Sequence, residues 1–111
     1  MANSSITPAD ASAEVKEQIG QAWSQSYHGK ADNAIRAFEG ILTRWPDHVD
    51  ANYGMSLALK NAKQPDKAAE GFRKTLQLLT DELTRAQGDD VVRYQMLSRM
   101  VEQQLENLKA R

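Results

Sequence analysis

Residues 31–46 read ADNAIRAFEGILTRWP, and the same pattern returns at residues 65–80 as PDKAAEGFRKTLQLLT. Ala68 and Phe72 repeat Ala34 and Phe38 with a period of 34 (68 minus 34). In both stretches the apolar residues are spaced by three and four, which is typical of one face of a helix. A fixed period of this size predicts stacked helical units, with the two phenylalanines filling the gaps between successive units.

Five helices are expected, and glycine and proline mark their ends. Pro8 and Pro65 suit the first turn of a helix, where the missing N–H is tolerated. Gly29 and Gly88 are typical of helix ends, and Pro46 stops the helix that precedes it. The expected helices span residues 8–28, 32–45, 48–62, 65–87 and 90–110. No sustained alternation of apolar and polar residues occurs, so no strand is expected.

Three of these helices share a second pattern, in which a small residue lies between two large apolar residues. The small residues are Gly20, Ser56 and Ser98. A small side chain allows a neighbouring helix to approach closely, and the large side chains fill the space on either side. The three copies read Ile19-Gly20-x2-Trp23, Met55-Ser56-x2-Leu59 and Leu97-Ser98-x2-Val101.

With this period, and with Pro46 at the repeat-ending position, the chain resembles the tetratricopeptide repeat family over about residues 14–103. The resemblance implies an all-α fold, a right-handed superhelix of antiparallel helical hairpins with five helices. It also implies a single domain over residues 1–111. Its parts would be residues 8–28 and 32–45 as the first repeat, 48–62 and 65–87 as the second, and 90–110 as a C-terminal capping helix.

Two departures from the family pattern predict local differences. The spacing from Trp23 to Ala34 is 11 (34 minus 23), which exceeds the family spacing, so the first hairpin turn is expected to be longer. Thr80 stands where a proline would end the second repeat, and the spacing from Ser56 to Ser98 is 42 (98 minus 56). Both of these features of the second repeat predict an extended fourth helix.

The composition excludes several classes of function. The 111 residues include 14 basic and 15 acidic side chains, a net charge of −1, and no cysteine. Disulfides and thiolate chemistry are therefore excluded, and no basic stripe suggests a nucleic-acid partner. No apolar run approaches the roughly 20 residues of a membrane span, and the start lacks a signal-peptide pattern. We expect a complete, small cytoplasmic protein with no nucleic-acid or membrane partner.

Enzymatic activity is not expected, and neither is a cofactor or a bound metal. The sequence has no Gly-rich phosphate loop and no zinc-binding or nucleophile motif. His28 lies in an expected turn. Asp47, His48 and Asp50 offer possible metal ligands, but no further ligand occurs at a recognisable spacing. The alternative is a helix N-terminus capped by Asp47 or Asp50, where a negative charge is favourable.

The resemblance implies a protein–protein interaction module. In the family, the first helices of successive repeats line a concave groove that holds a partner peptide. The groove residues implied here are Glu17, Gln21 and Ser24 on the first helix, Asp50, Tyr53, Leu57, Lys60 and Asn61 on the third, and Gln95, Arg99, Glu102 and Gln103 on the fifth. The alternative is that these residues form an ordinary solvated face.

The fifth helix suggests a second surface. Val92, Met96 and Met100 follow one another at intervals of four, beside the row that should pack on the fourth helix. Methionine adapts to varied partners, and a helix without a mate is a place for another helix to dock. A homo-oligomeric scaffold, such as a homodimer, would associate through these residues. The alternative is that the extended fourth helix covers them.

Overall fold

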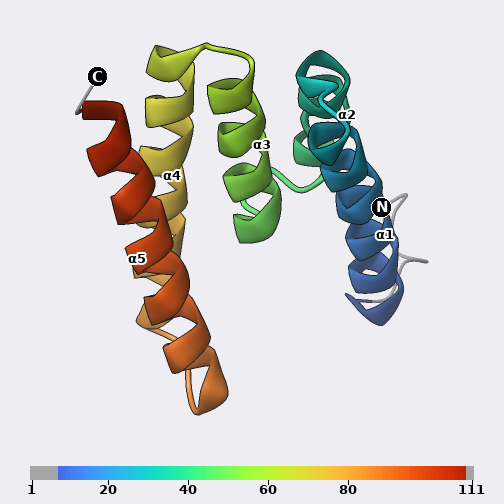
Figure 1. Cartoon of the computed structure of the whole chain (residues 1–111). Coiled ribbons are helices and arrows are strands. Elements are labelled where there is room, and N and C mark those ends of the chain that lie inside the picture. Colours follow the sequence, from blue (N-terminus) through green and yellow to red (C-terminus); the bar gives the residue numbers. More distant parts are fainter. Residues whose placement is uncertain (1–7, 110–111) are drawn as a thin grey trace.

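Helices form every regular element of the structure, a computed structural model that describes residues 8–109. They are α1 (Pro8–Tyr27), α2 (Ala31–Arg44), α3 (Val49–Asn61), α4 (Pro65–Leu83) and α5 (Asp89–Lys109). No strand occurs within residues 8–109. The predicted all-α class with five helices is confirmed (Figure 1).

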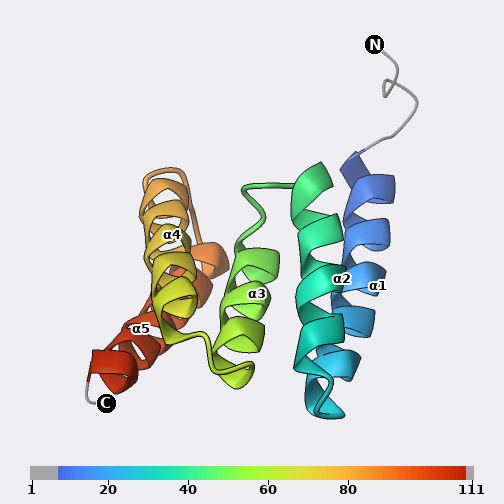
Figure 2. The same cartoon turned by 90° about the horizontal axis from the view of Figure 1, so that it is seen from above.

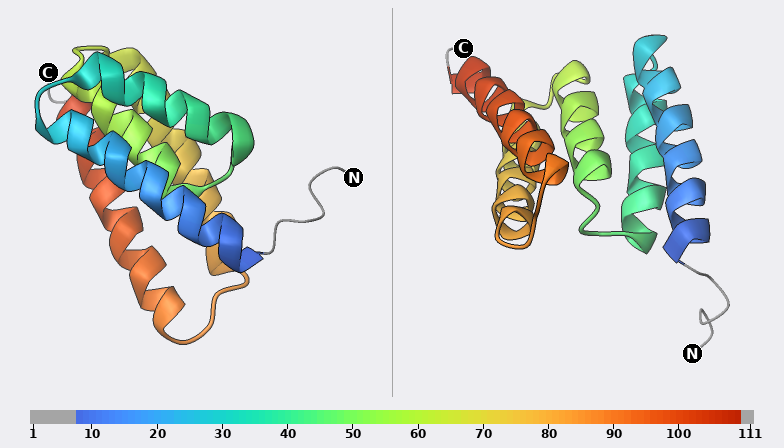
Figure 3. Two further views of the ribbon diagram at one scale, coloured as in Figure 1. Left: turned by 90° about the vertical axis from the view of Figure 1, so that its right-hand side faces the viewer. Right: turned by 90° about the horizontal axis from the view of Figure 1, so that it is seen from below.

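The helices stack in chain order. α1 packs antiparallel to α2, α2 lies against α3, α3 packs on α4, and α4 packs on α5. A further contact joins α1 to α3, the first helices of the two hairpins. Seen from above, α1 and α5 lie at opposite ends of the stack (Figure 2), and the two views of Figure 3 show the same order. The fold is a row of helical hairpins closed by one more helix.

The two hairpin turns are separated by the same period of 34 as the sequence pattern. α1 ends at Tyr27 and α2 begins at Ala31; adding 34 to each number gives Asn61 and Pro65, the end of α3 and the start of α4. The two hairpin turns are therefore equal in length. The prediction of a longer first turn is wrong.

The register of α1 explains this difference. Gly20 is exposed, and no atom lies within 4 Å of the position that a Cβ there would occupy. Ala22 is fully buried and precedes the equally buried Ser56 by one full period. The small residue that allows close packing in α1 is therefore Ala22 and not Gly20. The expected longer turn followed from aligning Gly20 with Ser56, although the residue that corresponds to Ser56 is Ala22.

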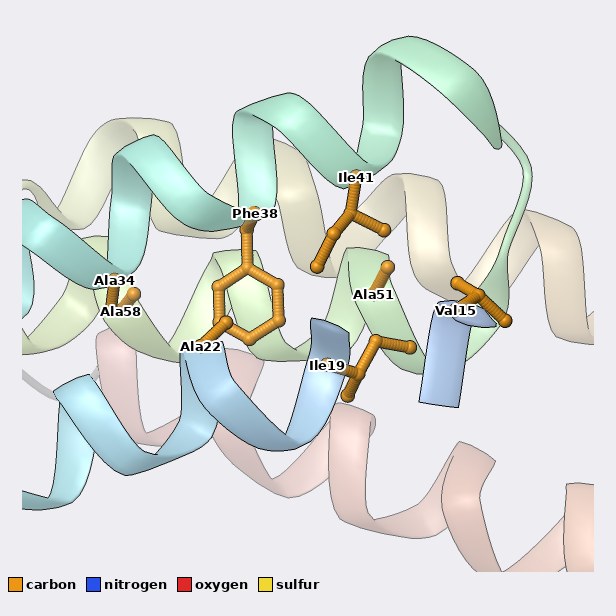
Figure 4. Packing of buried hydrophobic residues seen from close by; sticks show 8 residues of the cluster. All are labelled: Val15, Ile19, Ala22, Ala34, Phe38, Ile41, Ala51 and Ala58. Atoms are coloured by element: carbon orange, nitrogen blue, oxygen red, sulfur yellow. The ribbon is translucent and has the colours of Figure 1, made fainter. Parts of the chain in front are cut away.

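Phe38 and Phe72 fill the gaps between the hairpins, as the repeat predicts, and both are completely buried. Figure 4 shows the Phe38 ring pointing from α2 toward α1, next to Ala22. On the other side the ring meets Gly54 of α3, where an added Cβ would overlap the tip of the ring. The ring thus packs where α3 carries no side chain.

α4 ends at Leu83, before the predicted end at residue 87. The Thr84 N–H bonds to the Asp81 carbonyl at 3.3 Å, and the Thr84 hydroxyl donates to the same oxygen at 2.6 Å. Bonds that reach back only three residues tighten a last turn, and a threonine side chain that bonds the backbone competes with helix continuation. Gly88, with φ 62, then leads into α5.

α5 packs on α4 through one row of apolar residues. The row is Tyr94, Leu97, Val101, Leu105 and Leu108. Val101 is completely buried, whereas the other four are partly buried. α5 is anchored on one side only, which leaves most of its circumference exposed.

Candidate functional site

Aromatic rings from α1 and α3 gather on one face of the stack. Trp23 stacks on Tyr27 with ring centroids 5.8 Å apart, and Trp23 also meets Tyr53 of α3 at 6.5 Å. Tyr53 continues the row to Phe72 of α4 at 6.0 Å. Phe72 is buried, Trp23 and Tyr53 are half-buried, and Tyr27 is 79% exposed. The exposure of the rings therefore increases from Phe72 in the core to Tyr27 at the surface.

Polar side chains tie α3 to α1 and α5 on the same face. The Lys60 ammonium donates to Gln104 Oε1 of α5 at 2.6 Å, and the Asn61 amide donates to Ser26 Oγ of α1 at 3.4 Å. No carboxylate of the described residues lies within 4.0 Å of the Lys60 ammonium. Lys60 is thus a half-buried cation whose charge has no ionic partner in this part of the chain.

Burial raises the pKa of the Tyr53 phenol, and a hydrogen bond with Gln104 acts in the opposite direction. The phenol therefore stays protonated and uncharged at neutral pH. Tyr53 contributes an apolar ring and a hydroxyl group to this face, and no negative charge.

A recess of about 510 Å³ opens at the N-terminal end of α3. Its walls come from four helices and from the α2–α3 loop. The lining residues are Lys16, Asp47, His48, Val49, Asp50, Glu82, Arg93 and Tyr94. Both signs of charge are present, so the recess is a polar hollow suited to charged or hydrogen-bonding groups.

His48, one of the possible metal ligands, has a structural role. His48 is the N-cap of α3, and its Nδ1 accepts the Ala51 N–H at 3.3 Å. The prediction that Asp47 or Asp50 caps this helix is therefore wrong. His28 Nδ1 donates to the Ser24 carbonyl at 2.7 Å. In the part of the chain that the structure describes, no three His, Asp or Glu side chains form a group able to hold a metal ion.

A family comparison identifies the repeats directly. The sequence pattern of the family described as "Tetratricopeptide repeat" matches residues 27–101, which is more than half of the chain. The chain belongs to the tetratricopeptide repeat family. No curated protein and no solved structure matches it.

Members of the tetratricopeptide repeat family mediate protein–protein interactions, and the repeat is a non-enzymatic module. This supports the general role expected from the sequence. Among residues 8–109, none of the helices combines the length and the apolarity that a membrane crossing requires.

The five α3 residues assigned to the tetratricopeptide groove lie beside residues of the neighbouring helices. Tyr53 meets Trp23, and Lys60 and Asn61 bond to α5 and α1 as described above. Asp50 lines the recess at the start of α3, and Leu57 is half-buried beside the α4–α5 core. α3 is therefore the centre of the candidate surface.

The α1 residues expected in the groove lie elsewhere. Gln21 borders a recess between α1 and α2, together with Gln18 and Gln25, on the side of α1 away from α3. Glu17 and Ser24 are exposed. The period would have given the right face, because subtracting 34 from the α3 numbers gives Lys16, Ile19, Trp23, Ser26 and Tyr27.

The α5 residues expected in the groove are all exposed. Glu102 lines a recess with Arg73 of α4. Gln95 and Arg99 are exposed, and the exposed Gln103 bonds to Asn107 of its own helix. The residues of α5 that do reach the shared face are Arg93 and Gln104.

Sequence reasoning missed Arg93 and Gln104 because the register of α5 does not follow the period. α2 ends at Arg44 and α4 at Leu83, an offset of 39 (83 minus 44) in place of 34, which displaces the residues that follow in α5. The buried row centred on Val101 sets which side of α5 turns toward α3. We define the α1–α3–α5 face by Lys16, Trp23, Tyr27, Asp50, Tyr53, Leu57, Lys60, Asn61, Arg93 and Gln104.

Proposed function

We propose that this tetratricopeptide repeat chain binds a segment of a partner protein on its α1–α3–α5 face. One observation carries the proposal. Tyr53, whose ring meets the Trp23 ring that stacks on Tyr27, and Lys60 both hydrogen-bond to Gln104. The Lys60 ammonium has no carboxylate within 4.0 Å in the described chain. Aromatic side chains are enriched among the residues that dominate binding energy at protein interfaces.

The surface is held in place by the core beneath it. Tyr53 rests on the buried ring of Phe72, and Trp23 meets the buried ring of Phe38 edge to face at 6.0 Å. Side chains mounted on packed helices lose little further freedom when a ligand binds. The arrangement favours binding of a segment that carries an apolar side chain for the rings and an acceptor group for Lys60.

The test is a comparison of captured proteins. The immobilised chain is exposed to an extract of the cells that produce it, beside a variant carrying Tyr27→Ala and Lys60→Ala. Tyr27 is 79% exposed, so its truncation should leave the fold intact, whereas Tyr53 packs between two rings and is the second choice. We expect proteins that bind the native chain and are lost from the variant. Identical capture by both would contradict the proposal.

A matched control places the same number of changes outside the face. Gln21→Ala with Glu102→Ala alters two exposed residues that line other recesses. This control should capture the same partner as the native chain. If it loses the partner as well, the binding surface is not the α1–α3–α5 face.

A homo-oligomeric scaffold joined through α5 is the second candidate function. Its support is the exposure of Val92, Met96 and Met100, which are 56%, 58% and 49% accessible to solvent. Light scattering at several concentrations tests it, with Met96→Glu and Met100→Glu as the disrupting change. A mass that stays at 12.4 kDa would remove this candidate.

A further inference from the structure

The outer side of α5 carries an apolar row that no described residue covers. Val92, Met96 and Met100 are each about half exposed or more. At about 100° per residue, this row lies roughly 140° around the helix from the row that packs on α4. α5 is the last helix of the stack that the structure describes (Figures 1 and 2).

The packing of the other helices indicates which kind of element fits the outer side of α5. Ser56 of α3 is completely buried, and a Cβ added at Gly71 of the following helix would overlap its hydroxyl oxygen. Ala22 of α1 is completely buried beside Phe38 of α2. In each hairpin the first helix is thus covered by the helix that follows. Among the described residues α5 has no such helix, so a helix is the element that fits its outer side.

The charges around the row indicate the chemistry of that helix. Residues 91–101 contain Arg93 and Arg99 and no aspartate or glutamate. The two arginines lie about 60° to either side of the apolar row. Neither guanidinium has a carboxylate within 4.0 Å among the residues that the structure describes. Arg93 shares a recess with Glu82, but the ion pair of Glu82 is with Arg85.

We propose that the outer side of α5 docks an amphipathic helix of a partner protein, with acidic residues on both sides of its apolar row. The apolar row of that helix would cover Val92, Met96 and Met100, and its carboxylates would pair with Arg93 and Arg99. Bidentate arginine–carboxylate pairs add geometric specificity to such a contact. This surface shares Arg93 with the α1–α3–α5 face and otherwise consists of other residues.

A second copy of the chain fits the same surface less well. In a symmetric pair, parallel or antiparallel, residues 91–101 of one copy would lie on residues 91–101 of the other. Each copy would bring Arg93 and Arg99 to the flanks of the shared apolar row, and the nearest carboxylates in the sequence, Asp89, Asp90 and Glu102, stand only at the ends of that segment. Like charges brought together at an interface disfavour association. Charge complementarity therefore favours an acidic partner helix over a homodimer.

The experiment is a selection from displayed helical peptides of about 18 residues, long enough for an isolated helix to be populated. The peptides have a fixed apolar row and randomised flanking positions. They are selected on the native chain and counter-selected on a variant with Met96→Gln and Met100→Gln, which removes the apolar row without adding charge, so that the peptides that remain need the apolar row. We expect aspartate and glutamate to be enriched on both flanks.

Reversing the charges provides the matched control. On a variant with Arg93→Glu and Arg99→Glu, the same selection should enrich lysine and arginine instead. An acidic peptide selected on the native chain should bind this variant at least about tenfold more weakly. It should bind the variant carrying Tyr27→Ala and Lys60→Ala as it binds the native chain, which separates this surface from the α1–α3–α5 face.

Several results would overturn the proposal. They are flanks without an acidic preference, no enriched peptide, and unchanged binding after charge reversal. A further result concerns lipids. If the chain binds phosphatidylserine vesicles but no peptide, and if Arg93→Glu with Arg99→Glu abolishes vesicle binding, the surface binds anionic lipid. A concentration-dependent dimer that Met96→Glu and Met100→Glu dissociates would assign it to a second copy.

Discussion

α3 and α5 are successive first helices of the stack, but their surroundings differ. α3 lies between α2 and α4, and six of its 13 residues are buried. α5 has 21 residues and packs on α4 along one side, and only Val101 is buried among those described. Both segments form helices, so helix formation does not require cover on both sides. The larger exposed surface of α5 therefore results from its position at the end of the described stack, and not from an unusual sequence of the helix.

The largest effect should come from the core that surrounds α3. Phe38→Ala removes a completely buried ring that meets Gly54 and Trp23, and we expect a loss of about 3–5 kcal/mol in the free energy of unfolding. Met96→Ala on the open side of α5 should change it by less than about 0.5 kcal/mol. Urea denaturation followed by circular dichroism measures both. Comparable losses would show that α5 is covered in solution.

Two valines of α5 allow a buried and an exposed side of the same helix to be compared. Val101 is completely buried against α4, whereas Val92 is 56% exposed. Val101→Ala should lower the free energy of unfolding by about 2 kcal/mol, from the lost burial and the cavity that remains. Val92→Ala should have an effect below about 0.5 kcal/mol. Equal effects in the same denaturation assay would contradict the orientation of α5 on α4.

Two glycines that stand one period apart should respond in opposite directions. At Gly54 an added Cβ would overlap the buried Phe38 ring, so Gly54→Ala should destabilise the fold by about 1–2 kcal/mol. At Gly20 the space is open, and Gly20→Ala should stabilise α1 by about 0.5–1 kcal/mol. Melting temperatures of the two variants give the signs. A stabilising Gly54→Ala would mean that α2 and α3 are further apart than described.

The smallest effect concerns the pH dependence that Tyr53 contributes. Because burial raises its pKa in the folded chain, the unfolded chain releases the phenol proton at a lower pH. Tyr53 therefore lowers stability as pH rises above about 10, the usual pKa of tyrosine. Tyr53→Phe should flatten this alkaline decline and leave neutral stability lower by about 1 kcal/mol at most, through the lost bond to Gln104. A decline as steep as that of the native chain would show that Tyr53 does not cause it.

Much of the fold was predictable because Phe38 and Phe72 repeat with a period that also sets the positions of the two hairpin turns. The same period, applied to α3, would have placed Trp23 and Tyr27 in the candidate site. Gly20 misled the sequence reasoning, because a small residue in a helix need not face a neighbour. Small size permits close packing, but only the contacts of the folded chain decide where it occurs.

The sequence pattern could not predict the site residues of α5, Arg93 and Gln104, for a different reason. α4 ends at Leu83, five residues beyond the position that the period gives (44 plus 34 is 78), and the turn at Thr84 follows. The register of α5 therefore depends on how Val101 packs against α4. Gln104 and Arg93 reach the α1–α3–α5 face through this packing. A periodic pattern cannot predict a rotation that a non-periodic turn sets.

Site-specific photo-crosslinking tests directly whether partners bind the α1–α3–α5 face. A benzophenone side chain is placed in the living cell at Tyr27 on that face, or at Gln21 on the opposite side of α1, and both positions are exposed. We expect a discrete crosslinked partner from position 27 and none from position 21. The same partner crosslinked with equal yield from position 21, or from that position alone, would contradict it.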